Sequence, residues 1–182
     1  MGWFETVRDA VYDALCAVFK LNPASSDALK RFVPAYIKNA TNTQAPRNMN
    51  ICYYAISELQ GSGFDYIQER NTVVKGVPNI KVSKTIPVSV LITFYGDSAD
   101  NDSETFWSRF QFDSGAGSAR SVLRKKNIVP IGKPDRPVSL YEEEGTFHRR
   151  RCDVRLNLAY LESEESAVGY VDEVPDIVIQ NN

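Results

Sequence analysis

The sequence predicts a single α+β domain, in which helices pack against an antiparallel or mixed β-sheet. The first observation is an amphipathic segment, residues 2–20, whose apolar side chains recur at helical spacing. The second is the segment 146–161, TFHRRRCDVRLNLAYL, in which apolar and polar side chains alternate with a period of two. The third is the order of the segments, helix, strands, helix, strands, which is typical of α+β domains. A chain of 182 residues is long enough for one such domain with a real core.

The helix at residues 2–20 is expected to cover one face of the sheet, and Pro23 follows its end. A short helix capped by Ser25 or Ser26 is predicted next, and Pro34 limits its length. Both helices precede the first strand of the sheet.

The polar residues 39–50 are expected to form a loop. The first strong strand is predicted at 51–60, where both alternating sets are largely apolar, as in a strand covered on both sides. Residues 64–87 are predicted to form a hairpin arm with polar flanks, from a strand at 67–74 and the start of a strand at 80–95.

The acidic residues 97–102 are expected to form a solvated loop, with Ser103 capping a helix that ends near Gly115. A second helical piece is predicted at 118–127, because cations at its end suit the helix dipole. A short strand at 128–132 follows.

Residues 134–141 are predicted to form a turn and a short extended piece, and 142–145 to turn the chain into the long strand at 146–162. Residues 163–166 are expected to be a polar turn. The C-terminal segment 163–182 would then supply an edge strand at 168–179, because Pro175 cannot donate to a central ladder.

The composition is that of a globular protein, with 43 % hydrophobic and 24 % charged residues and a net charge of −2. Residues 1–140 hold 17 basic and 13 acidic side chains, whereas residues 141–182 hold 4 and 10. Such a chain can present opposite charges to two neighbours, although solvated charge gives the same pattern. No apolar run approaches the ~18 residues of a membrane span, and the acidic N-terminal segment does not resemble a signal peptide.

A catalytic or metal site is not predicted. Cys16, Cys52 and Cys152 lie far apart within apolar stretches, as expected of buried free thiols, and the single histidine, His148, stands among arginines. No nucleophile elbow, phosphate loop, dinucleotide fingerprint or zinc-protease motif is present, and no cofactor is expected.

The arginines of the long strand are the most ambiguous feature. Arg149, Arg151 and Arg155 share the polar side of the alternation. They suit acidic side chains of a neighbouring protein, but solvated charge and nucleic acid remain alternatives. Candidate interface residues in this chain, besides the three arginines, are the acids Glu142, Glu143, Glu144 and 162–165 and the arm lysines Lys75, Lys81 and Lys84.

Four stretches in this order resemble the neck terminator, or tail terminator, proteins of tailed bacteriophages. They are Ala45-Pro46-Arg47 before the paired tyrosines Tyr53 and Tyr54, the Tyr95-Gly96-Asp97 turn before a helix, FHRRRCDVRLNLAY at 147–160, and VGYVDEVPDIVIQ at 168–180. The resemblance covers residues 2–180, and it is weakest at 64–87 and around Phe106-Trp107.

The resemblance implies a structural virion protein with no chemistry, assembled in the bacterial cytoplasm. It implies a ring, commonly of six subunits, that caps the tail tube and joins it to the head-side connector or stopper, with DNA passing through the lumen. The implied partners are further copies of the chain, the tail tube protein, the connector and transiting genomic DNA, with a tail sheath protein as a further candidate and no membrane. Alternatives are another tail-completion protein without a six-fold ring and, more distantly, an enzyme.

Overall fold

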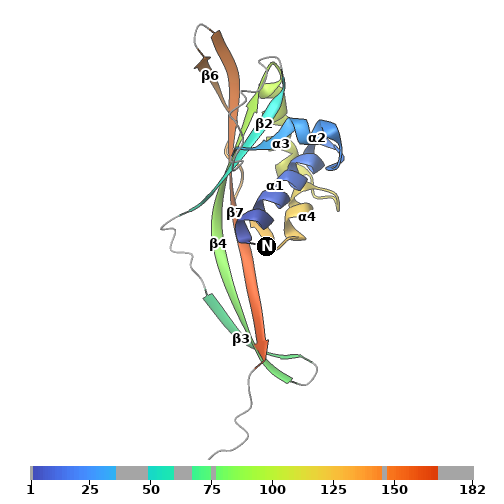
Figure 1. Ribbon diagram of the computed structural model, residues 1–182, viewed down its shortest axis with the longest axis vertical. Coiled ribbons are helices and arrows are strands. Elements are labelled where there is room, and N and C mark those ends of the chain that lie inside the picture. The colour runs from blue at the N-terminus through green and yellow to red at the C-terminus, as the bar shows by residue number, and fades with distance from the viewer. Residues whose placement is uncertain (1, 36–48, 60–66, 75–76, 145–146, 168–182) are drawn as a thin grey trace, which may run out of the picture.

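A computed structural model describes residues 2–35, 49–59, 67–74, 77–144 and 147–167. These residues form one α+β domain around an elongated, mixed sheet of seven strands, as the sequence predicts (Figure 1). The strand order is β1-β2-β4-β7-β5, with β3 added to β4 and β6 added to β7. Among the strands of the described residues, only β1 and β2 pair in parallel. The strands are β1 (Phe32–Pro34), β2 (Ile51–Glu58), β3 (Ile67–Val74), β4 (Val77–Tyr95), β5 (Ile128–Pro130), β6 (Val138–Glu144) and β7 (Phe147–Ala167).

Two long antiparallel strands, β4 and β7, form the spine of the molecule (Figure 1). Their register is unbroken from the pair Tyr95–Arg151 to the pair Asn79–Ala167. An unbroken register keeps the period-two alternation intact, so one side of the ribbon stays continuous along its whole length. Shorter strands then extend the sheet on both edges of this ribbon.

The helices cover one face of the upper part of the sheet (Figure 1). They are α1 (Trp3–Phe19), α2 (Ser26–Arg31), α3 (Ala99–Phe112) and α4 (Ala119–Arg124). The core lies between them and the apolar side of the ribbon. Its strand side is formed by Ile86, Val88, Val90, Ile92 and Phe94 of β4 and by Cys152, Val154, Leu156 and Leu158 of β7. The predicted roles of the N-terminal helix and of the alternating strand are therefore confirmed.

The second helix is shorter than predicted, because Phe32 leaves it to start β1. Ser25 caps α2, accepting a hydrogen bond from the Ala28 amide at 3.2 Å, and the helix ends at Arg31. Phe32 is then buried in the core, and β1 pairs in parallel with β2. A pairing with a distant strand, which local spacing does not reveal, decides this boundary.

The prediction of a solvated loop at 97–102 is wrong, because α3 begins at Ala99 with Ser98 as its N-cap residue. Carboxylates are favourable in a first helical turn, where the free amides point. Ser103 is therefore inside the helix rather than its cap. It is fully buried, and its hydroxyl lies 2.8 Å from the Asp100 carbonyl oxygen and 3.0 Å from the Cys152 sulfur.

The C-terminal strands also depart from the predicted turns. Residues 142–144, expected in a turn, belong to β6, where Glu142 pairs with Arg149 of β7. Residues 163–166, expected as a polar turn, continue β7, because β4 supplies backbone partners along their whole length. The predicted edge strand at 168–179 and most of the loop at 39–50 lie outside the described residues.

In the segment where the sequence predicts a two-stranded arm, β3 pairs with β4, and β7 adds a third strand on the other edge of β4. We use the name arm for β3, residues 77–84 of β4 and residues 161–167 of β7. These strands extend beyond the helices at one end of the molecule (Figure 1). Because β4 runs without interruption from the core into the arm, the arm is a continuation of the central sheet.

Replacing Gly96 by alanine is expected to lower the free energy of unfolding by about 1–3 kcal/mol. Gly96 joins β4 to α3 with φ at +99°, and an added Cβ would lie 2.5 Å from the Asn50 side-chain oxygen and 2.9 Å from the Met49 carbonyl oxygen. Urea unfolding followed by circular dichroism measures the change. Gly117→Ala is the matched control, since nothing lies within 4 Å of its added Cβ. Equal stability of the two variants would contradict the prediction.

Candidate functional site

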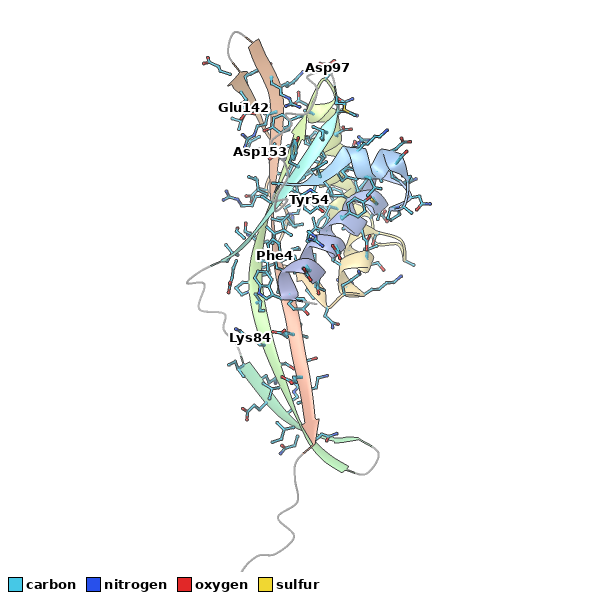
Figure 2. All side chains as sticks on the ribbon, in the orientation of Figure 1. Phe4, Tyr54, Lys84, Asp97, Glu142 and Asp153 are labelled. Carbon is cyan, nitrogen blue, oxygen red and sulfur yellow. The ribbon has the colours of Figure 1, made fainter. Side chains whose placement is uncertain are left out.

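The candidate site is the sheet face that no described helix covers, which we call the open face. The sequence predicts that β2 is covered on both sides, but among the described residues helices cover only one. Figure 2 shows the labelled Glu142 and Asp153 on the side of the sheet away from the helices. The strand registers place the following side chains on this face: Tyr53 of β2, Leu91, Thr93 and Tyr95 of β4, Val138, Leu140 and Glu142 of β6, and Arg149, Arg151, Asp153, Arg155 and Asn157 of β7.

Arg151 is occupied by partners within its own chain. Its guanidinium donates two hydrogen bonds to the Asp153 carboxylate, at 2.8 and 2.7 Å, and lies 3.6 Å from Glu142. The hydrogen bonds to Asp153 raise the pKa of Arg151 further above its ordinary value, against the opposing effect of burial. This arginine therefore joins β7 to β6 and is the least available of the three for a neighbour.

Arg149 has donors without partners. Its guanidinium carbon lies 4.3 Å from the centre of the Tyr95 ring, a cation–π contact. Its Nε and Nη2 atoms are buried and have no hydrogen-bond partner among the described residues. Burial raises the pKa of Tyr95 to about 12, with a further contribution from its hydrogen bond to Glu142. These two atoms are shielded from solvent, so it is the positive charge of the stacked guanidinium, and not these two donors, that can attract a carboxylate from outside the chain.

Arg155 is exposed, and within the described part of the chain its side chain has no hydrogen bond or ion pair. Its cross-strand partner in β4 is Leu91, which is half-buried. Asp153 and Asn157 are the next residues of β7 on the open face. The Asn157 side-chain oxygen is itself buried without a partner among the described residues. The structure thus separates the three predicted arginines into Arg151, which carboxylates of its own chain occupy, and two without a carboxylate partner among the described residues, of which Arg155 is exposed and Arg149 is half-buried.

The arm carries charges of opposite sign on its two faces. On the side continuous with the helix-covered face, Glu69, Glu162 and Glu164 accompany Lys84, a net charge of −2. On the other side lie Arg70 and Lys81. We call the first of these surfaces the acidic face of the arm.

Among the remaining predicted interface residues, the structure describes the side chain of Glu143, which has the opposite parity to the open-face residues of β6. Glu143 is exposed on β6 and pairs with His148 in register. Lys75 and the side chain of Glu144 lie outside the described residues.

Two ion pairs that the sequence did not suggest hold α3 to its neighbours. Arg150 forms an ion pair with Asp100, and Arg31 lies 2.8 Å from Asp102. Arg31 also stacks over Phe19, at 4.5 Å from its ring centre. Arg150 points to the helix side because it has the opposite parity to Arg149 and Arg151, which is a signal that the sequence does contain. These pairs position α3 and leave the open face unchanged.

The described residues contain no group of three or more histidine, cysteine, aspartate or glutamate side chains that could hold a metal ion. The three cysteines are buried and free, as predicted. Among the helices of the described residues, none has the length and apolar character needed to cross a membrane.

Comparison with known proteins adds one finding. A family model described as phage neck terminator protein matches residues 5–182, nearly the whole chain. No curated protein sequence matches this chain. The family match spans the helices, the open face and the arm together.

Proposed function

This chain belongs to the phage neck terminator protein family, and from that premise we propose that it forms a ring that ends the tail tube and joins it to the head. The resemblance inferred from the sequence is confirmed by the family match. The protein is thus a structural tail component of the virion, placed at the head–tail junction, and its family implies a role without catalysis.

The proposed ring is a homohexamer that contacts the tail tube protein on one side and the head-side connector or stopper on the other. Assembly takes place in the bacterial cytoplasm, and genomic DNA passes through the lumen of the ring without sequence-specific recognition. A tail sheath protein is a further partner in this proposal. The main support for the ring is the family match, which includes both the uncovered sheet face and the arm. A single subunit leaves these two surfaces without a neighbour.

A ring of identical subunits needs one surface that is complementary to a different surface of the next copy. Arg149 and Arg155 on the open face are the proposed contact residues, because neither has a carboxylate partner among the described residues. The charged arm, with Lys81 and Lys84, is the second candidate surface. Arginine suits such contacts, since its planar guanidinium pairs with carboxylates through two parallel hydrogen bonds.

Deletion of the gene from the phage tests this function. We expect infected cells to accumulate filled heads beside tails that fail to join them, or tails of uncontrolled length, with almost no infectious particles. The wild-type gene supplied in trans is the control and should restore virions. Normal virions from the deletion phage would contradict the proposal. Electron microscopy of wild-type necks tests the ring itself, and a neck density without six-fold symmetry would reject the hexamer.

A further inference from the structure

We propose that the acidic face of the arm docks on Arg149 and Arg155 of the next copy of this chain. The inference rests on the proposed ring and goes beyond it, because it names the two surfaces that meet. It makes the arm the element that reaches from one subunit to its neighbour.

Charge complementarity supports this pairing. The acidic face of the arm carries three carboxylates and one ammonium group, a net charge of −2. The open face carries three guanidinium groups and the carboxylates of Glu142 and Asp153, a net charge of +1. Arg151 with these two carboxylates sums to −1, so the net positive charge of the open face comes from Arg149 and Arg155. Opposite potentials favour docking of one surface on the other.

Both surfaces also contain exposed apolar side chains near the charges. Ile67, next to Lys84 on the arm, is 59 % exposed, and Val138 and Leu140 on the open face are 54 % and 43 % exposed. An apolar centre with a charged rim is the usual composition of a protein interface. The combination favours a protein neighbour over DNA, whose binding depends on many phosphate contacts from cations.

The two surfaces cannot meet within one subunit. They lie on opposite sides of the same ribbon, because Glu162 and Glu164 have the parity of the helix-covered side and Arg155 has the other. Seven residues of extended strand separate Arg155 from Glu162, about 23 Å at roughly 3.3 Å per residue. The arm must therefore bind the open face of a different copy. Such a contact is heterologous and closes into a ring when its rotation permits.

A cross-linking experiment in assembled particles tests the docking. The variant Arg155→Cys with Glu164→Cys is supplied in trans to the deletion phage, and purified particles are treated with a short bismaleimide. Cys16, Cys52 and Cys152 are at most 1 % exposed, so within this chain the reagent reaches only the two introduced thiols. We expect a ladder of covalent oligomers that extends beyond the dimer, at least about tenfold stronger than for either single variant. The control pair, Arg155→Cys with the exposed α3 residue Glu104→Cys, should give no ladder.

Several outcomes would overturn the inference. The arm does not dock on the next copy if the variant chains enter particles but remain monomeric. The same conclusion follows if cross-linking stops at the dimer or links the chain to a different virion protein. Absence of the wild-type chain from virions would instead reject the proposed function. If the double-cysteine variant alone fails to enter particles, the charge-conserving variant Arg155→Lys replaces it. Carbodiimide should then couple the new amine to Glu162 or Glu164, and failure to find that link by mass spectrometry also rejects the docking.

Discussion

Replacing Phe106 by alanine is expected to lower the free energy of unfolding by about 3–5 kcal/mol. Phe106 of α3 is 1 % exposed, and its ring centre lies 6.1 Å from that of Phe94 in β4 and 5.4 Å from that of Phe110. The substitution removes the ring that joins the helix to the central strand and leaves a cavity that these neighbours cannot fill. Urea unfolding at fixed protein concentration, followed by circular dichroism, measures the loss.

The matched control for this prediction is Phe112→Ala in the same helix. The Phe112 side chain is 74 % exposed, so its loss should change the free energy of unfolding by only about 0.5 kcal/mol. If Phe106→Ala stays within about 1 kcal/mol of the wild type, the packing of α3 on the sheet is not the one described.

Reversing the charge of Arg155 is expected to reduce the yield of infectious particles by about two orders of magnitude. The Arg155→Glu variant would place a carboxylate against Glu162 and Glu164 of the next subunit, and like charges at an interface are strongly unfavourable. The combined change Glu162→Lys and Glu164→Lys should cause a similar loss, because it places ammonium groups against Arg155. A chain with all three changes restores opposite charges and should recover most of the yield. Plaque titration of a complemented deletion phage measures each variant.

Arg124→Glu is the control for charge reversal, since Arg124 is exposed on α4 on the helix side of the sheet. It should leave the titre near the wild-type value. Failure of the triple change to recover titre, with each variant folded by circular dichroism, would contradict direct pairing. Arg151 is unsuited to this test, because its hydrogen bonds to Asp153 mean that a reversal would disturb the subunit itself.

The elements with strong periodicity were predictable from the sequence. The apolar stripe of α1 and the alternation of β7 each reflect burial on one side, which is the physical cause of both patterns. For the same reason the alternation places Arg149, Arg151 and Arg155 together on the polar side. These features depend only on the nearest residues along the chain.

The start of α3 and the end of β7 were not predictable in this way. Asp100 and Asp102 look like loop residues, but Arg150 and Arg31 neutralise them from distant parts of the chain. Residues 163–166 are polar because the arm extends beyond the helices, so their strand has little core to face. The unbroken pairing with β4 supplies the backbone partners that their side chains do not indicate.

The sequence by itself determined the α+β class, the helix-covered side of the central strands and the family to which the protein belongs. Only the tertiary structure decided which arginine is free. Arg149, Arg151 and Asp153 share one face of the same strand, but strand pairing brings Glu142 of β6 to Arg151 and the ring of Tyr95 of β4 to Arg149. Strand parity is a local property of the backbone, but the partner of a charged side chain depends on which strands lie beside it, and pairing between distant segments sets that arrangement.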